Sequence, residues 1–214
     1  MFFLKDALGN TISVIKIDPS SAKKSEKIVI FSHGNGCDIY TFSNQLRCYA
    51  EKFGCAFVCY DYLGYGLTEG NPSEENCYSA INVVVNHYVN KVGMNNVILV
   101  GQSLGTGVTI HCANEMKWKY PIILISPYKS IARVVYDSCV TESSFSHNMF
   151  CTYKKIGLLS CPIKIIHGTN DTVINVSHGK YLYTLLKNPL DPEWREGLGH
   201  NNIYLEERDI VPML

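Results

Sequence analysis

The sequence predicts an α/β protein in which a mostly parallel central sheet carries helices on both faces. Its apolar runs are nearly continuous and of strand length, which is typical of parallel strands covered on both sides. They fall at residues 27–32, 55–60, 96–101, 121–126 and 162–168. Helical stretches separate them, at residues 38–53, 73–91, 103–117 and 176–187. Such alternation implies right-handed crossovers within one sheet.

The N-terminal part of the chain predicts a short hairpin and one helix start. Residues 11–17 alternate between apolar and polar with a period of two, and Gly9-Asn10 before them has turn composition. Ser73 precedes two glutamates, and acidic side chains in the first turn of a helix are favoured by its dipole. A hairpin at the sheet edge and a helix from about residue 73 are therefore expected.

The later part of the chain contains one helix of interest and one irregular stretch. The helix at 103–117 places Leu104, Val108 and Ile110 along a plausible inner face. Residues 127–160 have the least regular pattern of the chain, which indicates a short insertion or lid. The length of 214 residues fits a single domain spanning residues 1–214 with that insertion inside it.

Composition and charge restrict the partners. Nineteen Lys and Arg residues balance nineteen Asp and Glu residues, and only 18% of the chain is charged, so we expect no nucleic-acid partner. No apolar run reaches the 18 or so residues that a membrane span needs. Lys5 and Asp6 interrupt any signal-peptide core at the N-terminus.

Cysteine usage indicates the compartment. The chain has nine cysteines, an odd number, and several lie inside apolar runs, as Cys55 and Cys59 do. Buried free thiols behave as small hydrophobes, and no pair has the Cys-x-x-Cys spacing of a metal site. We therefore expect a reducing, cytoplasmic location and no metal.

One motif predicts nucleophilic chemistry at a serine. Residues 101–105 read Gly-Gln-Ser-Leu-Gly, a G-x-S-x-G pattern that follows an apolar strand and opens a helix. That strand–turn–helix setting is the one a nucleophile elbow requires, with Ser103 at the turn. An ordinary strand-to-helix turn with a capping serine is the alternative interpretation.

A serine hydroxyl at neutral pH needs a general base, which an acid in turn orients. Asp171 lies just past the apolar strand at 162–168, and His200 lies in a loop before a short terminal helix. The order Ser, acid, His is that of the α/β-hydrolase fold. We therefore expect Ser103, Asp171 and His200 to act together. Competing candidates are the histidines at 33, 87, 111, 147, 167 and 178 and the acids Asp137, Asp191 and Glu196.

A glycine-containing loop after the strand at 27–32 predicts an oxyanion hole. His33-Gly34-Asn35-Gly36 follows that strand. Backbone N–H groups placed there stabilise the negative charge of a tetrahedral intermediate. We expect the amides of Asn35 and Leu104 to be the donors, Gly36 to let the backbone approach the substrate, and His33 to brace the loop. The loop lacks the spacing of a phosphate-binding motif.

These motifs together resemble a known subfamily. In chain order they read HGNG, YDYLGYGLTEG, GQSLGTG, ISPYKS, IIHGTNDTVINVSHG and EGLGHNNI. They are similar to the α/β-hydrolase domain-containing protein 17 subfamily, which removes palmitate from membrane-anchored proteins. The resemblance covers residues 27–205. It implies an α/β-hydrolase fold, a serine hydrolase with Ser103, Asp171 and His200 as its triad, and no cofactor.

Membrane contact is where the sequence departs from that subfamily. The relatives carry a cysteine-rich N-terminal segment that is itself palmitoylated, whereas this chain has no cysteine before Cys37. We therefore expect a cytoplasmic protein with at most peripheral contact with membranes and no transmembrane segment.

The substrate follows from the same resemblance. We expect a thioester of palmitate on a protein, cleaved through an acyl-Ser103 intermediate, with Tyr65 lining the acyl groove and Tyr62, Leu67 and Tyr128 as further candidates. The short insertion suggests an open site that admits a protein-borne acyl chain. The alternatives are a carboxylesterase or lipase acting on lipid-like esters, then a serine peptidase, and last a catalytically silent binding module.

Overall fold

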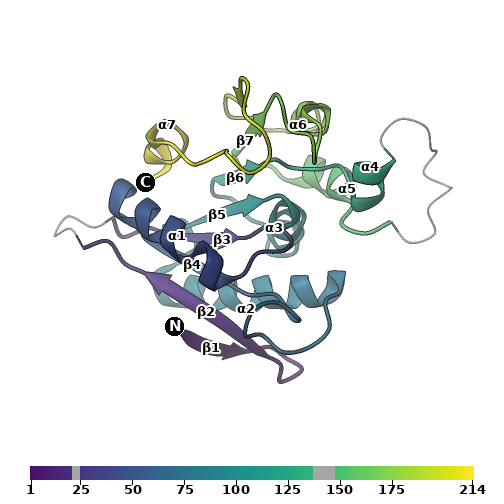
Figure 1. Ribbon diagram of the computed structural model, residues 1–214. Helices are drawn as coiled ribbons and strands as arrows, with labels where there is room; N and C mark the ends of the chain where they lie inside the picture. Colours follow the sequence, from purple (N-terminus) through teal and green to yellow (C-terminus); the bar gives the residue numbers. More distant parts are fainter. Residues whose placement is uncertain (21–24, 137–147) are drawn as a thin grey trace.

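The computed structural model describes residues 1–20, 25–136 and 148–214, which form one eight-stranded sheet flanked by helices (Figure 1). The strand order is β1-β2-β4-β3-β5-β6-β7-β8. The strands are β1 Phe2–Lys5, β2 Thr11–Ile17, β3 Ile28–Ser32, β4 Ala56–Tyr60, β5 Val97–Gln102, β6 Ile122–Ile125, β7 Ile163–Gly168 and β8 Glu193–Arg195. The helices are α1 Ile39–Phe53, α2 Glu74–Val92, α3 Leu104–Glu115, α4 Ile131–Val135, α5 Thr152–Lys155, α6 Val176–Tyr183 and α7 Glu207–Ile210, with 3-10 turns η1 Met94–Asn96, η3 Ile156–Leu158 and η4 Val211–Met213.

The sheet is mostly parallel, as the apolar runs predict. Strands β3 to β8 run parallel to one another, while β1 pairs antiparallel with β2 and β2 pairs antiparallel with β4. The N-terminal hairpin is confirmed, with Gly9 at a positive φ of 84° in its turn. The short strand β8 was not predicted, because three residues outside an apolar run carry no periodic signal.

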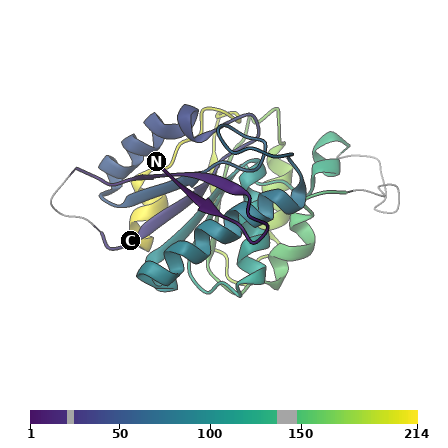
Figure 2. The ribbon, with the colours of Figure 1, turned by 90° about the horizontal axis from the view of Figure 1, so that it is seen from below.

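Helices cover both faces of the sheet, as Figure 2 shows with the sheet seen from its β1 edge. One hydrophobic cluster joins the sheet to α2, α3 and α6, with Val84, Val108 and Leu182 among its buried members. A second cluster on the opposite face joins it to α1 and α7, through Leu46 and Ile210. The parallel strands are therefore buried on both sides, which explains their near-continuous apolar sequences.

Capping residues fix the starts of the two long helices. The side chain of Asp38 accepts a hydrogen bond from the Thr41 amide, and the Thr41 hydroxyl in turn bonds the Asp38 amide, a capping box at the start of α1. Ser73 caps α2 by accepting from the amide of Asn76. Both helices begin within a residue of the predicted positions.

Helix α3 differs from the prediction of a single inner face. Leu104, Val108 and Ile110 are all buried, but so are most other residues of the helix, glycines and threonines included. The reason is that α3 is enclosed by β3 and β5, by α2 and by α5. A helix buried on most sides shows no amphipathic stripe in its sequence.

The predicted insertion at 127–160 contains α4 and, after a gap, α5 and η3. Residues 137–147, which include the candidates Asp137 and His147, lie outside the described residues. Helix α5 packs against α3, so this part of the insertion rests on the central layer. In the described part of the chain, no helix has the length and apolar character to cross a membrane.

A close contact between helix and sheet lies at Gly105. A Cβ atom at this position would stand 2.0 Å from the carbonyl oxygen of Ser32 in β3. Strand β3 and helix α3 therefore meet backbone to backbone, which only a residue without a side chain permits. This contact positions the turn between β5 and α3 against the end of β3.

We expect Gly105→Ala to destabilise the fold by about 1–3 kcal/mol or more, because α3 must move away from β3. The free energy of unfolding in urea measures this. Gly199→Ala is the matched control, since its Cβ would meet nothing nearer than the Asn170 carbonyl oxygen at 3.6 Å, an ordinary van der Waals contact. Equal losses in the two variants would contradict the role of the close contact.

Candidate active site

Ser103 occupies a strained turn between β5 and α3. Its φ of 52° and ψ of −120° lie where non-glycine residues are rarely found. Such a conformation costs roughly 1–3 kcal/mol and persists only when its surroundings enforce it. The Ser103 amide donates to the Ile125 carbonyl at 2.9 Å, and the Thr106 amide donates to the Ser103 carbonyl at the same distance. The turn is thus held from β6 and from within α3.

The glycines around Ser103 are needed because the backbone is crowded there. A Cβ at Gly101 would lie 2.5 Å from the carbonyl oxygen of Gly105. A Cβ at Gly34, in the loop after β3, would lie 3.3 Å from the Cβ of Ser103. The glycines of the G-x-S-x-G pattern are therefore explained by the tight packing of the turn. Gly34 in turn lets the neighbouring loop pass beside the serine.

The structure brings Ser103, His200 and Asp171 into one chain of hydrogen bonds. His200 Nε2 lies 3.0 Å from Ser103 Oγ, and His200 Nδ1 lies 2.7 Å from Asp171 Oδ2. A carboxylate can only accept, so Nδ1 carries the proton and Nε2 presents a lone pair to the serine hydroxyl. All three side chains come from loops at the carboxyl edge of the parallel strands, where α/β sheets place their sites.

Asp171 is fixed by its own loop. It is 4% exposed, and its Oδ1 accepts hydrogen bonds from the amides of Val173 at 2.9 Å and Ile174 at 2.7 Å. Burial alone would raise the pKa of Asp171, but hydrogen bonds from His167, His200 and the Ile174 amide outweigh it and hold the pKa well below its usual range. The carboxylate is therefore ionised at every ordinary pH.

His167, which the sequence offers only as a competing histidine, is a neighbour of this site. It is fully buried at the end of β7, and its Nε2 donates to the Ile174 carbonyl at 2.8 Å while lying 3.4 Å from Asp171 Oδ2. It therefore braces both the carboxylate and the loop behind it. Its position inside an apolar strand made it read as an ordinary core residue, and only the i,i+4 spacing to Asp171 hinted at the contact.

A buried ion pair anchors the segment that carries His200. Arg195, in β8, places Nη2 at 3.0 and 2.8 Å from the two carboxylate oxygens of Asp209 in α7. Arg195 is 6% exposed and Asp209 is fully buried. Within the loop, the Gly199 amide donates to Asn202 Oδ1 at 2.7 Å. The loop is thus tied at both ends and braced in the middle.

The predicted oxyanion donors lie on either side of Ser103. Asn35 and Leu104 both line the space in front of the serine hydroxyl. As the first residue of α3, Leu104 has an N–H without an intrahelical acceptor. Within the described residues the Asn35 N–H also has no hydrogen-bond acceptor. Two residues that line this space thus have backbone N–H groups without an acceptor among the described residues.

The loop bearing Asn35 is held by aromatic and histidine side chains. The Tyr65 hydroxyl donates to Asn35 Oδ1 at 2.7 Å. His33 is fully buried, with Nδ1 2.8 Å from the Gly34 carbonyl oxygen and Nε2 3.6 Å from Asp61 Oδ1. His33 therefore lies behind the loop and away from Ser103's hydrogen-bond partners.

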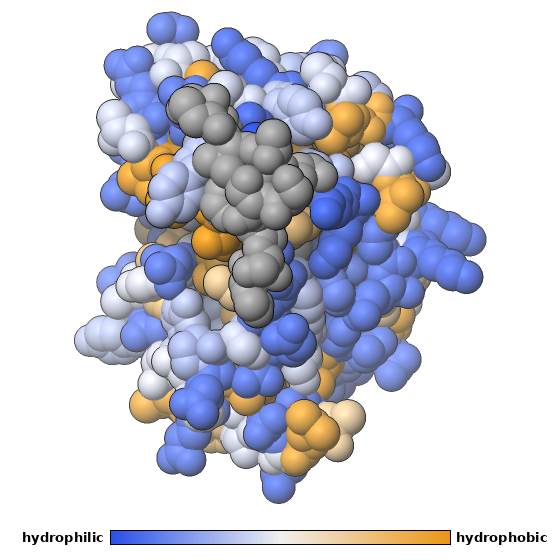
Figure 3. Space-filling view, turned by 90° about the vertical axis from the view of Figure 1, so that its right-hand side faces the viewer, coloured by the Kyte–Doolittle hydropathy of each residue, from blue (hydrophilic) through white to orange (hydrophobic). Residues whose placement is uncertain are grey.

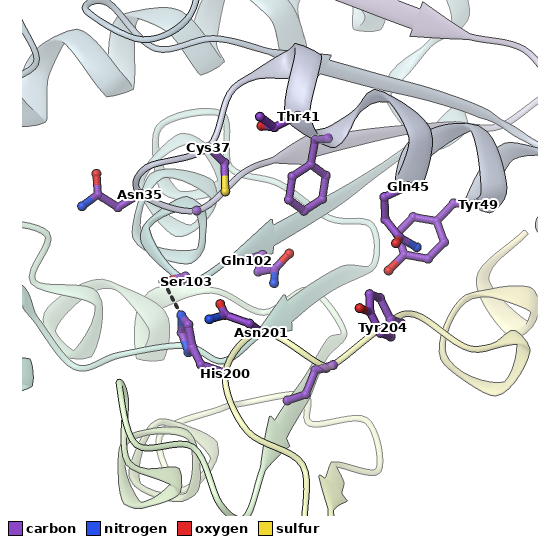
Figure 4. A pocket seen from close by; sticks show the side chains of 13 residues that line it. Asn35, Cys37, Thr41, Gln45, Tyr49, Gln102, Ser103, His200, Asn201 and Tyr204 are labelled. Carbon is purple, nitrogen blue, oxygen red and sulfur yellow. Dashed lines mark hydrogen bonds between the residues drawn. The ribbon is translucent and has the colours of Figure 1, made fainter.

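Two cavities flank Ser103. The first, which we call the amide-lined cavity, has a volume of about 260 Å³ and lies between α1 and the segment after His200 (Figure 4). Its polar walls include the side chains of Asn35, Gln45, Gln102 and Asn201. The second, the apolar cavity, has a volume of about 290 Å³ and lies toward α4. Its walls include Leu104, Tyr128, Ile131, Val134, Phe150 and Ile174.

Some of the other predicted site residues line these cavities, and others do not. Tyr65 and Tyr128 line the apolar cavity, as expected of an acyl groove. Tyr62 is instead fully buried behind the loop, donating to the His33 carbonyl, and Leu67 is 65% exposed outside both cavities. Gly36 lines neither cavity, and its φ of 72° explains the glycine. The approach of its backbone to the substrate stays a prediction.

The described residues contain no candidate metal site. In the described ranges, residues 1–20, 25–136 and 148–214, no group of three or more His, Cys, Asp or Glu side chains is arranged to hold an ion. The chemistry that the arrangement itself offers is proton transfer between Ser103 and His200, beside two free backbone donors.

Sequence comparison places the chain among known hydrolases. Residues 29–196 match the model of the alpha/beta hydrolase family. A putative alpha/beta hydrolase of Acanthamoeba polyphaga mimivirus is 45% identical over 199 residues, covering 91% of this chain and 74% of that protein. Human alpha/beta hydrolase domain-containing protein 17B is 34% identical, covering 95% and 70%. The human 17C protein is 33% identical, and the chain spans 61% of its length.

Comparison with solved structures shows the same fold. An alpha-beta serine hydrolase homologue from Coxiella burnetii superimposes with a TM-score of 0.73 at 16% identity, over 93% of this chain and 88% of that one. Est1E from Butyrivibrio proteoclasticus with ferulic acid bound gives a TM-score of 0.76 at 14% identity, over 99% and 94%.

The pKa of Asp171 predicts a pH-dependent stability. Because this pKa is lowered from 3.8 on folding, the carboxylate stabilises the folded state above pH 3.8 and loses that contribution as the pH falls toward the folded pKa. We therefore expect Asp171→Asn to be less stable than wild type near neutral pH and the difference to shrink below about pH 4. Urea unfolding of both proteins across this range measures it, and a difference that grows on acidification would contradict the assignment.

Proposed function

The chain belongs to the alpha/beta hydrolase family and, within it, to the alpha/beta hydrolase domain-containing protein 17 subfamily, and from this premise we propose that it is a serine hydrolase cleaving acyl thioesters and esters. The observation that carries the proposal is the hydrogen-bonded chain from Ser103 through His200 to Asp171. Its favoured substrate is an S-palmitoyl group on a protein.

The first half of the proposed reaction acylates the serine. His200 Nε2 takes the proton of Ser103 Oγ as the oxygen attacks the substrate carbonyl carbon. Asp171, ionised because its pKa is held low, stabilises the imidazolium that forms. The amides of Asn35 and Leu104 stabilise the tetrahedral oxyanion. Collapse of this intermediate breaks the bond to the leaving group, which receives the proton from His200.

The second half returns the enzyme to its starting state. A water molecule gives a proton to His200 Nε2 as it attacks the acyl-Ser103 carbonyl carbon, and the same backbone donors stabilise the second oxyanion. Collapse releases the carboxylic acid and returns the proton to Ser103 Oγ. His200 thus needs the same tautomer at the start of both halves, which its hydrogen bond to Asp171 supplies.

The apolar cavity supports an acyl chain as the group bound on the α4 side. Its lining side chains are largely aliphatic or aromatic, and burying each methylene there gains about 0.8 kcal/mol. Glu74 at its wall is paired, accepting from the Tyr78 hydroxyl and lying 4.0 Å from Lys155 Nζ. The charge is therefore compensated, and the cavity suits an uncharged chain.

The cavity opens on a face with exposed apolar groups. Its lining residues Met149 and Val173 are 44% and 54% exposed. Figure 3 shows this face, where apolar groups in orange lie beside the grey segment. We propose that a chain longer than the cavity continues over these side chains, so a long acyl group on a protein can be accommodated without a closed tunnel.

The cellular setting is also a proposal. The cysteines in the described residues, eight of them, are all free thiols, which supports a reducing cytoplasmic compartment. Peripheral contact with a membrane would bring the site to lipid-anchored substrates.

Ser103→Ala tests the chemistry. We expect hydrolysis to fall by roughly 10⁶-fold and labelling by a fluorophosphonate to disappear, because the nucleophile is lost. Wild type should turn over an S-palmitoyl peptide faster than the matching oxygen ester. A higher rate on the oxygen ester, with the thioester at background, would instead support a carboxylesterase. Absence of labelling in wild type would exclude a serine hydrolase.

Val134→Phe tests the acyl site. Val134 lines the apolar cavity, so a larger side chain should lower kcat/KM for a palmitoyl substrate by about tenfold or more while affecting an acetyl substrate much less. Val135→Phe is the matched control, because Val135 is 65% exposed and lies outside the cavity wall. Equal loss on long and short chains would contradict this placement.

A further inference from the structure

The amide-lined cavity lies on the opposite side of Ser103 from the apolar cavity. If the acyl chain is bound toward α4, as the proposed function has it, the group that leaves the carbonyl must be bound toward α1. The inference below rests on that function and concerns the leaving group. The cavity reaches from Ser103 and His200 to Tyr204 and the α1 residues Gln45 and Tyr49.

The walls of this cavity are polar but uncharged. The described residues that line it include no Asp, Glu, Lys or Arg. A phosphate group placed there would lose its hydration without gaining a counter-charge, which is costly. Leaving groups such as coenzyme A or a lysophospholipid headgroup therefore fit poorly.

Two amide side chains in the cavity are free to bind a ligand. Gln102 and Asn201 both face it, and neither side chain hydrogen-bonds to any described residue (Figure 4). By contrast, the Tyr49 hydroxyl is engaged with Gln45 and accepts the Leu205 amide at 3.0 Å. Gln102 directly precedes Ser103 and Asn201 directly follows His200, so the two amides flank the reacting groups.

A peptide backbone can form hydrogen bonds with the side-chain amides of both Gln102 and Asn201. Each primary amide offers both a donor and an acceptor, and so does each peptide unit on either side of an acylated cysteine. Phe42 and Ile203 add apolar surface in the same cavity for the stems of the peptide side chains. A simple alcohol or thiol would leave the amides without partners.

We propose that the amide-lined cavity is a leaving-group subsite for an uncharged peptide, with Gln102 and Asn201 as its specificity-determining residues. In the acylation step, the Ser103 Oγ–carbon bond forms and the carbon–sulfur bond breaks. The cysteine sulfur leaves with the electron pair and takes the proton from His200 Nε2. The resulting peptide thiol departs through this cavity.

Three thioesters of one acyl chain test the proposal. An S-octanoyl cysteine in a capped, uncharged tripeptide, S-octanoyl ethanethiol and S-octanoyl coenzyme A share the acyl part and differ only in the leaving group. For wild type we expect kcat/KM on the peptide to exceed that on the coenzyme A ester by about tenfold or more. Turnover of the ethanethiol ester reports on the proposed chemistry independently of leaving-group recognition.

Substitutions of Gln102 and Asn201 test whether these two amides determine the selectivity for the leaving group. Gln102→Met and Asn201→Leu should each lower the ratio of kcat/KM for peptide over ethanethiol ester by about three- to tenfold, as expected for a lost neutral hydrogen bond. Asn86→Leu, on the exposed face of α2, is the matched control and should leave this ratio unchanged. Gln45→Lys adds a cation and should shift selectivity toward the coenzyme A ester.

The outcomes separate this inference from the proposed function. Equal wild-type rates on the peptide and coenzyme A esters, with normal fluorophosphonate labelling, would overturn the subsite and leave the hydrolase intact. So would a uniform loss on all three esters in both amide variants, because that pattern indicates a structural role. Failure of wild type to hydrolyse even the ethanethiol ester, or to react with the fluorophosphonate, would be a failure of the proposed function.

Discussion

The backbone contact between α3 and the end of β3 is the constraint on which the site depends. Gly105 lies against the Ser32 carbonyl, and Gly34 in the following loop lies against Ser103. These contacts bring the oxyanion loop and the serine turn together at one edge of the sheet. They also hold Ser103 at its unfavourable φ, so the strain is offset by packing from strands on both sides of β5.

The sequence predicts those parts of the molecule that follow from local chemistry. Five buried strands, the hairpin and the start of α2 after Ser73 all have residue patterns that leave few alternatives. The approach of Ser103, Asp171 and His200 could be anticipated because the carboxyl ends of parallel strands share one edge. These three residues are far apart in the sequence, but the topology of the sheet brings their loops together.

What the sequence did not reveal depends on tertiary context. His167 contacts Asp171 from a strand whose other residues are ordinary core, so only the i,i+4 spacing marks the contact locally. Strand β8 is too short for a periodic signal, and α3 is buried on most sides because neighbours from β3, α2 and α5 enclose it. That Gly34 is the glycine beside Ser103 is likewise a property of the folded loop alone.

The order of the elements along the chain also decides when the ion pair between Arg195 and Asp209 can form. The chain is synthesised from its N-terminus, and the elements around Ser103 precede β7, β8 and α7. A nascent chain can therefore form the strained turn while Asp171 and His200 are still missing, and its serine is then an ordinary alcohol. The loop bearing His200 acquires its second anchor only when Asp209 in α7 arrives. The hydrogen-bonded chain from Ser103 to Asp171 can therefore form only after β7, β8 and the loop bearing His200 have joined the fold.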